Sequence, residues 1–369
     1  MPIPLLLHGK HDGSVLYEPF GPWIVPWRFT SPEEEYATLR TTAGLVDYST
    51  QALIELQGAD RASFLQRLLT NDIARLVPGT GCYAALLDPS AKLIAPLIVF
   101  ADPDALWLMC DLPNSETVAA MINRYLFSER VQLVHHERRV AVLAIDGPQA
   151  ADVVAALTGT STLPSQPLHH VTTLFDQFTV RWLRHSVTGT DGILGLVPGD
   201  DAPALWELLR RSALTLGAQP VGWETLNVAR IEGGQPWFDI DMDATNLLPE
   251  TGLERSMVSD SKGCYIGQEI IARLHTYGSP NKKLMGLLVD GEAVPKPGER
   301  LSRTGEDVGW ITSGCYSPAL RRPIAMGYVK RGWYKPATTV ELVGNAGSPA
   351  AIVVELPSLQ EHVRQQVKR

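Results

Sequence analysis

The spacing of apolar and polar residues divides the 369-residue chain into two parts of different character. Up to about residue 280, short apolar runs alternate with stretches whose apolar residues recur at helical spacing. From Lys283 onward, short alternating runs are interrupted by Gly, Pro and Asn, and no helical spacing is evident until Leu359. Such punctuation is typical of a small antiparallel barrel or sandwich. We therefore predict an α+β region over residues 1–280, a β-barrel domain over 283–357 and a C-terminal tail over 358–369.

Two segments of the α+β region share one order of elements. Residues 54–70 contain a short alternating strand, a glycine turn at Gly58 and an amphipathic helix. Residues 143–158 repeat that order around Gly147, which lies 89 residues after Gly58. Strand–glycine–helix units are common, so coincidence and internal duplication both remain open. In either case we expect two interleaved subdomains.

Local signals place the remaining elements. Ser31, Pro32 and three glutamates form a helix start, because serine caps the helix, proline suits its first position and acids favour its positive end. A small set of further elements is predicted by periodicity: strands over 95–100, 105–109 and 140–145, and helices over 31–42, 202–211 and 222–231.

Composition limits the classes of function. A 45% hydrophobic content supports a sizeable core and two or three domains. The net charge of −8 argues against a nucleic-acid surface, which needs clustered Lys and Arg. No apolar run approaches the length of a membrane span, and the N-terminal residues lack the basic start of a signal peptide. We therefore expect a cytoplasmic protein without membrane or nucleic-acid partners.

The octapeptide KGCYIGQE, residues 262–269, carries the strongest chemical signal. It places Cys264 shortly before a predicted helix whose apolar face includes Ile270 and Leu274. The helix dipole and the ammonium of Lys262 would both favour the thiolate. Free cysteines are more often small buried hydrophobes, but this context favours reactivity. We predict that Cys264 is an accessible thiol with a lowered pKa and that Lys262 supplies charge.

The neighbours of Cys264 have expected roles. Gly263 and Gly267 would permit a tight loop, and Gln268 and Glu269 would hold that loop or cap exposed N–H groups. Further along the helix, Arg273 and His275 would face a ligand or a partner protein.

The other cysteines and the histidine pairs carry weaker signals. Cys82, Cys110 and Cys315 lie in apolar, strand-like contexts and are expected in the core. The four cysteines contain no C-x-x-C pair, so neither a disulfide framework nor a self-contained metal site is indicated. Adjacent histidines in a strand point to opposite faces, so His135–His136 and His169–His170 are expected to be solvated loop residues without a metal.

KGCYIGQE, continued by Ile270-Ile271-Ala272-Arg273 and His275, resembles the signature of the YgfZ-type folate-binding proteins. These are relatives of the T-protein, the aminomethyltransferase of the glycine cleavage system, and are linked to iron–sulfur cluster assembly or repair. Residues 21–23, 42–47, 69–73 and 308–314 resemble further T-protein blocks, so the resemblance covers nearly the whole chain. It implies a three-domain T-protein-like fold, a central folate channel and a C-terminal antiparallel barrel.

The resemblance also implies ligands and site residues. Tetrahydrofolate is the implied cofactor, and an iron–sulfur cluster would be held only transiently, if at all. The implied folate-binding residues are Arg230, Asn246, Gly263, Tyr265, Gly267, Gln268, Glu269 and Arg273. Two alternatives come from the residues alone: Arg230 and Glu232 could form a surface ion pair, and the loop holding Asp241, Asp243 and Asn246 could be a solvated turn.

Two positions depart from the T-protein pattern. The strand that carries the T-protein acid reads Leu93-Ile94-Ala95-Pro96-Leu97-Ile98-Val99 here, so Ala95 and Pro96 replace the acids. Proline cannot transfer a proton. Leu194 stands where the family places its pterin-binding glutamate. The missing acids argue against aminomethyl transfer by the T-protein route.

Three functions remain open at this point. The first is a folate-binding accessory protein for iron–sulfur protein assembly or repair, with Cys264 as its working thiol and client or assembly proteins as partners. The second is a folate-dependent aminomethyl or methyl transferase with a changed acid–base residue. The third is a non-catalytic folate-binding scaffold. Whether the protein is an enzyme depends on which of these holds.

Overall fold

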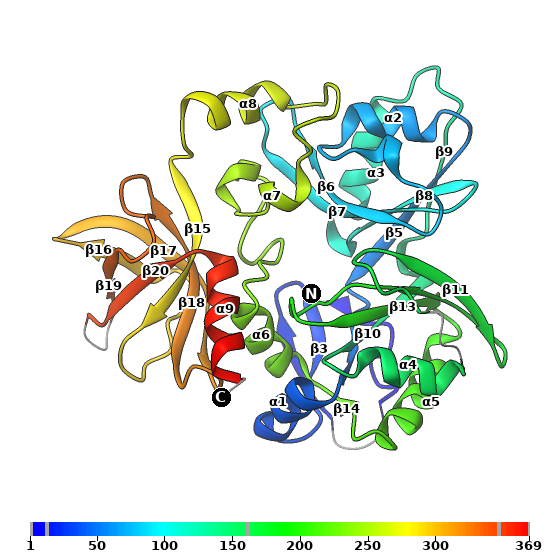
Figure 1. Cartoon of the computed structure of the whole chain (residues 1–369), viewed down its shortest axis with the longest axis horizontal. Coiled ribbons are helices and arrows are strands. Elements are labelled where there is room, and N and C mark those ends of the chain that lie inside the picture. Colours follow the sequence, from blue (N-terminus) through cyan, green and yellow to red (C-terminus); the bar gives the residue numbers. More distant parts are fainter. Residues whose placement is uncertain (1–2, 12–14, 160–162, 345–347, 368–369) are drawn as a thin grey trace. The chain divides into compact units, whose positions relative to one another are not determined.

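A computed structural model describes residues 3–11, 15–159, 163–344 and 348–367 (Figure 1). The chain forms two compact units, and neither is continuous in sequence. The first comprises Met1–Leu87, Ile94–Thr225 and Ser256–Ile266, and the second comprises Asp88–Leu93, Leu226–Arg255 and Gly267–Arg369. The predicted region 1–280 is therefore shared between the two compact units, because residues 226–255 lie with the barrel.

Two large sheets and one small sheet form the first unit. The six-stranded sheet has the order β11-β12-β13-β10-β4-β14, the five-stranded sheet β6-β7-β8-β5-β9, and the small sheet β1-β3-β2. The strands are β1 Ile3–Pro4, β2 Leu16–Phe20, β3 Trp23–Arg28, β4 Gly44–Asp47, β5 Gln51–Gln57, β6 Gly81–Leu87, β7 Leu93–Ala101, β8 Ala105–Asp111, β9 Gln132–His135, β10 Val140–Asp146, β11 His170–Phe175, β12 Phe178–Leu183, β13 Gly192–Pro198 and β14 Gln219–Pro220.

Helices border these sheets. They are α1 Pro32–Thr41, α2 Arg61–Leu68, α3 Ser115–Arg124, α4 Ala150–Thr158, α5 Ala202–Leu214 and α6 Trp223–Glu232, the last of which continues into the second unit. The predicted start of α1 is confirmed: Ser31 Oγ accepts a hydrogen bond from the Glu34 N–H at 3.3 Å, and Pro32 is the first helical residue.

The two predicted strand–glycine–helix units are confirmed, and each occupies a different sheet. In one of them, strand β5 of the five-stranded sheet leads through Gly58 into helix α2. In the other, strand β10 of the six-stranded sheet leads through Gly147 into helix α4. Both glycines have positive φ, +105° and +133°, and a Cβ would lie 2.0 Å from Arg130 O at the first and 2.7 Å from Thr42 O at the second. Only glycine fits such a turn. Each of the two larger sheets therefore carries one strand–glycine–helix unit of the same local design.

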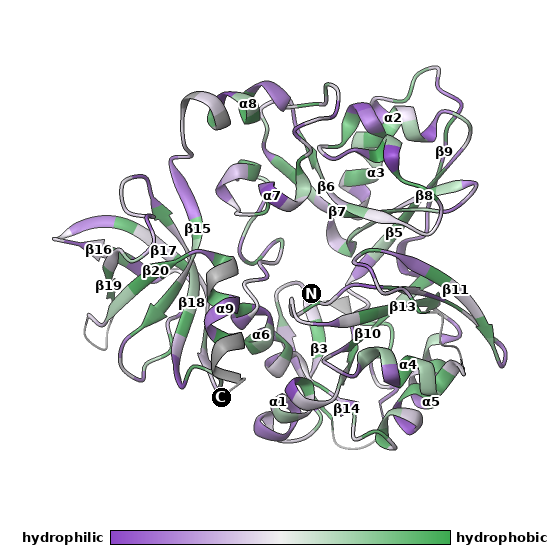
Figure 2. Ribbon diagram, in the orientation of Figure 1, coloured by the Kyte–Doolittle hydropathy of each residue, from purple (hydrophilic) through white to green (hydrophobic). Residues whose placement is uncertain are grey.

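Each of the two larger sheets has its own hydrophobic core. Phe64 and Leu65 of α2 pack with residues of β5 and β8, and Val153 and Val154 of α4 pack with Trp182 and residues of α5. Figure 2 shows the hydrophobic colour concentrated on central strands such as β10 and β13. Burying each of these large side chains stabilises the fold by about 1.5–3 kcal/mol.

The second unit contains the predicted barrel. Six strands close in the order β15-β18-β17-β16-β19-β20. Their bounds are β15 Lys282–Val289, β16 Arg300–Arg303, β17 Glu306–Ser317, β18 Arg322–Lys330, β19 Thr339–Val343 and β20 Ala350–Val354. Two helices precede the barrel, α7 Glu254–Met257 and α8 Gln268–Tyr277. The sequence placed this domain correctly because close glycine and proline punctuation marks short antiparallel strands.

The C-terminal segment, whose helical spacing was predicted from Leu359 onward, forms helix α9 Leu356–Val367, which packs on the barrel. Leu359 is fully buried and lies beside Gly286 of β15, and Leu356 and Val363 are also buried. The spacing of these three residues is helical, and their burial on the barrel gives a short terminal helix the stability it lacks alone. Residues 368 and 369 lie outside the described part of the chain.

Within the described ranges, no helix is long and apolar enough to cross a bilayer.

Candidate functional site

Residues Ser256–Ile266 form the part of the chain after Thr225 that belongs with the first unit. We call these residues the return segment. It contains four of the predicted site residues, Lys262, Gly263, Cys264 and Tyr265. The chain passes back into the second unit at Gly267, so the predicted octapeptide is divided between two compact units.

The return segment is tied to the residues that follow helix α2. Thr70 Oγ1 donates to Met257 O at 2.6 Å, and the Ser259 N–H donates to Thr70 O at 3.1 Å. Asn71 Nδ2 donates to Ser256 O at 3.4 Å. Thr70 is fully buried, and its hydroxyl also accepts from the Ala85 N–H at 2.8 Å. Because buried polar groups are costly to leave unpaired, these bonds fix the path of the segment.

The ammonium of Lys262 is hydrogen-bonded to backbone carbonyls at and just after the end of helix α2. Its Nζ donates to Gln66 O at 2.7 Å, to Asn71 O at 2.9 Å and to Leu69 O. Burial lowers the pKa of Lys262 to about 8, while Asp72 and Cys82 act in the opposite direction. Its three donors are therefore used on backbone carbonyls at the end of α2.

Cys264 is exposed, as predicted, but it does not lie at a helix start. Helix α8 begins at Gln268 with Gly267 as its N-cap, four residues beyond the cysteine. The effect of a helix dipole falls off within the first turn, so little of it reaches a thiol four residues before the helix. Accessibility is what distinguishes the Cys264 thiol.

The other three cysteines are less suited to reaction. Cys110 and Cys315 are buried, as predicted, and burial raises the pKa of each thiol. Cys82 on β6 is partly buried, and burial raises its pKa to about 12, against a smaller opposing effect of Lys262. A thiol with a raised pKa carries little thiolate near neutral pH.

The two glycines of the octapeptide differ in their requirement. Gly267 has φ +80°, and a Cβ there would lie 2.9 Å from Asp88 O and 3.1 Å from Ala91 Cα. Asp88 and Ala91 belong to the turn between β6 and β7, in which the Asp88 N–H donates to Lys92 O at 3.0 Å. A Cβ added at Gly263 would have no neighbouring atom within 4 Å. Only Gly267 is needed for the path of the chain.

We expect Gly267→Ala to lower the free energy of unfolding by about 1–3 kcal/mol, because alanine meets both a left-handed backbone and a close carbonyl. Gly263→Ala is the matched control and should change it by less than about 0.5 kcal/mol. Urea unfolding of the two variants measures the difference. Equal losses for both would contradict the geometry at Gly267.

The remaining octapeptide residues lie around the start of α8. Tyr265 is mostly buried under Lys262, whose Nζ lies 5.2 Å from the ring centroid, and burial raises the pKa of Tyr265 to about 12. Gln268 begins the helix, and Glu269 pairs with Arg273 one turn later. Both partners of that pair are more than 70% exposed. The side chain of His275 lies outside the described part of the structure.

Arg230, an implied folate residue, is buried in a polar network of the second unit. Its guanidinium donates to Asp241, to Ser313 Oγ at 2.7 Å and to Asn227 Oδ1 at 2.9 Å, and it lies 4.5 Å from the Trp237 ring centroid. The side chains of the Arg230–Asp241 pair are 1% and 0% exposed. The interpretation of Arg230 and Glu232 as a surface ion pair is therefore wrong, because Arg230 is buried.

Glu232 and Asp241 each join α6 or the loop after it to the barrel. Glu232 is fully buried and accepts from Ser317 Oγ. Asp241 accepts from Thr312 Oγ1 at 2.7 Å and from Ser313 Oγ at 2.6 Å. The solvated-turn interpretation of the loop therefore fails at Asp241, because its carboxylate is needed to pair a buried cation.

Asn246 closes the same loop. Its Oδ1 accepts from the Asp243 N–H at 3.0 Å, and its Nδ2 donates to Glu250 Oε2 at 3.3 Å. Its backbone carbonyl accepts from the Leu93 N–H at 2.9 Å. Asn246 is 3% exposed; its side chain holds the loop, and its backbone carbonyl joins the loop to Leu93 at the start of β7.

The two strand positions without acids are placed as the sequence indicated. Pro96 lies in β7 and is partly exposed. Leu194 lies in β13 between Leu183 of β12 and Ala144 of β10, and it is fully buried. Neither position presents a carboxylate that could hold a pterin.

A contact between the two large sheets escaped the sequence reasoning. Tyr83 of β6 lies 3.0 Å, oxygen to Nδ1, from His185, which follows β12. Burial raises the pKa of Tyr83 to about 12 and lowers that of His185 to about 4. At neutral pH the tyrosine therefore donates and the neutral imidazole accepts. No local signal connects residues 102 positions apart.

Two histidine predictions need correction. His170 is buried, and its Nε2 lies 2.9 Å from Ala101 O. His136 Nε2 lies 2.9 Å from Glu55 Oε2, and both side chains are mostly buried. His136 and His170, one from each adjacent pair, therefore pack within the sheets. No group of three or more metal-binding side chains occurs among the residues the structure describes.

Buried acids were also missed. Asp47 of β4 is fully buried, and burial raises its pKa to about 6. Its Oδ1 accepts from the Ser49 N–H at 3.2 Å, and within the described residues its Oδ2 has no hydrogen-bond partner. Asp146 of β10 has a pKa raised to about 6 for the same reason, but the Val187 N–H and three hydroxyls donate hydrogen bonds to it.

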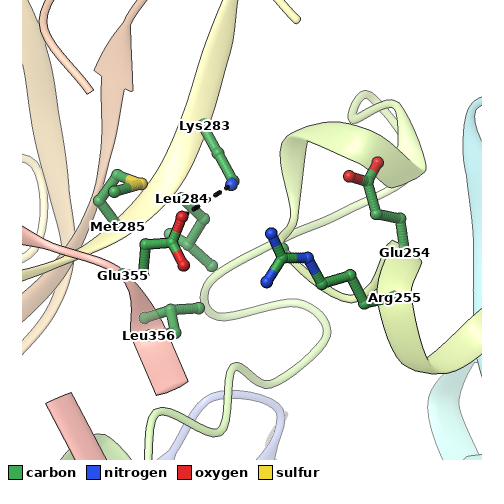
Figure 3. Close-up of a pocket in the computed structure, with 8 residues that line it drawn as sticks. Glu254, Arg255, Lys283, Leu284, Met285, Glu355 and Leu356 are labelled. Carbon is green, nitrogen blue, oxygen red and sulfur yellow. Dashed lines mark ion pairs between the residues drawn. The ribbon is translucent and has the colours of Figure 1, made fainter. Parts of the chain in front are cut away.

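A small, partly open pocket lies in the second unit, between α7, β15 and the start of α9 (Figure 3). Leu284, Met285 and Leu356 form its apolar part. Lys283 and Glu355 form an ion pair at 4.0 Å on one side, and Arg255 extends toward it from α7. Neither Lys262 nor Cys264 is among the residues that line this pocket, so it is not the predicted thiol site.

Two family models match this chain, one over the α+β region and one over the closed barrel. The family model described as the GCVT N-terminal domain matches residues 8–261. The model described as the glycine cleavage T-protein C-terminal barrel domain matches residues 282–359.

Individual relatives agree with the family models. An aminomethyltransferase of Geobacillus thermodenitrificans is 30% identical over 84% of this chain and 85% of its own length. One from Symbiobacterium thermophilum is 29% identical over 92% of each. The crystal structure of glycine cleavage system aminomethyltransferase T from Bartonella henselae superimposes with a TM-score of 0.88, at 25% identity over 98% of this chain and 99% of that one. The chain belongs to the glycine cleavage T-protein family.

Proposed function

We propose that this protein binds a reduced folate and serves a folate-dependent transfer of a one-carbon group, such as an aminomethyl or methyl group. The observation that carries this proposal is the match to aminomethyltransferase structure over 98% of the chain at a TM-score of 0.88. Both family models and the relatives named above support it.

This transfer would need an acid–base group other than the strand carboxylate of T-proteins. Pro96 and Leu194 occupy the positions that the resemblance assigns to acids, and neither can exchange a proton. A reduced folate would therefore be held without those two carboxylates. This disagreement limits the proposal to folate binding and to the class of transfer, and it gives no reason to assign a proton-transfer step.

A second candidate function rests on Cys264. An exposed thiol lies on a segment held in place by six polar bonds, and the octapeptide around it resembles that of YgfZ-type proteins. We infer as an alternative a folate-binding accessory role in iron–sulfur protein assembly or repair. The relatives reported above are named for aminomethyl transfer, so they favour the first proposal, whereas the exposed cysteine favours the second.

A folate titration followed by activity assays, both on the same two proteins, separates these functions and the scaffold alternative. The wild type and Cys264→Ser are titrated with tetrahydrofolate, followed by intrinsic tryptophan fluorescence. We expect both to bind equally, with a Kd above the nanomolar range, because losing one charged hydrogen-bond partner costs about 1.5–3 kcal/mol. Nanomolar affinity for a monoglutamyl folate would contradict the account of β7 and β13.

Activity assays on the same two proteins then decide the function. Turnover of a methylated amine with tetrahydrofolate, unchanged by Cys264→Ser, supports the transferase. Absence of turnover, together with a Cys264-dependent gain in the activity of an iron–sulfur enzyme in cell extract, supports the accessory role. A gain that survives Cys264→Ser supports the scaffold.

A further inference from the structure

The ammonium of Lys262 caps the C-terminal end of helix α2, although Lys262 lies far from that helix in sequence. The last carbonyls of any helix lack partners within it, and a cation there also interacts favourably with the helix dipole. Gln66 belongs to the last turn of α2 and Leu69 is its C-cap, and the carbonyls of both accept from Lys262 Nζ. The third acceptor, Asn71 O, lies two residues further on. One ammonium group thus supplies its three donors to three acceptors.

The position of this contact within the return segment is informative. The bonds from Thr70 and Asn71 hold the first part of the segment, at Ser256, Met257 and Ser259. Beyond Ser259, Lys262 supplies the next polar bonds to the body of the unit. Ile266 then packs against the core of the five-stranded sheet. Lys262 therefore anchors the segment at a point two residues before Cys264.

The groups that face Lys262 come from several elements. The Tyr265 ring lies beneath its Nζ at 5.2 Å, and Asp72 and Cys82 act electrostatically on it from the turn after α2 and from β6. Each of these contacts and all three hydrogen bonds lie within the first unit. The three hydrogen bonds join the ammonium to the body of the first unit, and the Tyr265 contact lies within the return segment itself.

We propose that Lys262 is a positioning residue that fixes the return segment on the end of α2 and so holds Cys264 exposed at one place on the first unit. It acts through the backbone that it anchors, and its charge is used on the helix carbonyls. The relevance of that position rests on the proposed use of Cys264, but the anchoring itself does not depend on any activity.

The test compares Lys262→Met, Lys262→Arg and a control, Arg67→Met, in the full-length protein. Arg67 also lies in the last turn of α2, but its side chain pairs with Glu129. Hydrogen exchange followed by mass spectrometry reads the protection of amides 257–265. We expect Lys262→Met to speed their exchange by at least about tenfold, while amides of β10 and β13 are unchanged. Lys262→Arg should retain most of the protection, and Arg67→Met all of it.

A second readout separates anchoring from a charge effect on the thiol. The rate of Cys264 alkylation is measured from pH 6 to 10, and the midpoint of its rise should be the same in Lys262→Met as in the wild type. If Lys262 acted on the thiol directly, its loss would raise that midpoint by about one pH unit, as expected for the loss of a neighbouring opposite charge.

Three results for Lys262→Met would overturn the proposal. The first is a raised midpoint of Cys264 alkylation with unchanged exchange of amides 257–265, and the second is unchanged exchange of these amides with an unchanged midpoint. The third is faster amide exchange throughout the first unit. The first would restore the charge-supplying role, and the last would mean a general loss of stability. Loss of function in the Cys264→Ser experiment above is a separate result, so failure of the anchor and failure of the proposed function are distinguishable.

Discussion

Iodoacetamide at pH 7.5 is expected to label Cys264 at least about 100-fold faster than any other cysteine of the native protein. The physical reason is that the Cys264 thiol is accessible to the reagent, whereas burial shields the other three thiols and raises their pKa. Cys264 is exposed, Cys110 and Cys315 are buried, and the pKa of the partly buried Cys82 is raised to about 12. A thiol with that pKa is ionised in only about one molecule in 30,000 at pH 7.5.

Mass-spectrometric site assignment at short labelling times measures this order directly. The matched control is the same protein unfolded in urea, in which all four cysteines should react at similar rates because burial no longer distinguishes them. Faster labelling of Cys82 in the native protein would contradict the assignment of Cys264 as the working thiol. Labelling of Cys264 only after unfolding would mean that the return segment covers it.

Replacing Arg230 by methionine is expected to cost about 3–5 kcal/mol of unfolding free energy, because Asp241 would remain as a buried charge without its partner. The loss should appear in urea unfolding of the full chain. The matched control is Arg300→Met. Arg300 pairs with Asp307 on the barrel surface, where both side chains are about half exposed, and its loss should cost less than about 1 kcal/mol.

The result for Arg230 also tests its implied role in folate binding. A large loss of stability with unchanged affinity for tetrahydrofolate, measured at a temperature where the variant is folded, assigns Arg230 to the packing of α6 on the barrel. A small loss of stability with a large loss of affinity would support the folate role that the family resemblance implied.

The candidate site illustrates where sequence reasoning stops. The octapeptide gave the exposed cysteine, since a lysine and two glycines around one thiol are unusual in a buried strand. It could not give the direction of Lys262, because the three carbonyls that accept from it lie 191 to 196 residues earlier in the chain. The same limit hid the Tyr83–His185 contact and the partners of Arg230.

By itself, the sequence determined the features that depend on neighbouring residues. The cap of α1, the glycine turns at Gly58 and Gly147 and the strands of the barrel follow from local backbone preferences and from the period of apolar side chains. The replacement of the strand acids by Ala95 and Pro96 is also a property of the sequence alone.

Tertiary structure decided what depends on distant pairing. It placed Ser256–Ile266 with the first unit, packed helix α9 on the barrel and buried Arg230 with Asp241. Burial and hydrogen-bond partners are set by the packing of segments far apart in sequence, and no local pattern encodes them. The ionisation and direction of a side chain follow from that packing, which is why Lys262 was identified as a site residue from the sequence while its partners came only from the fold.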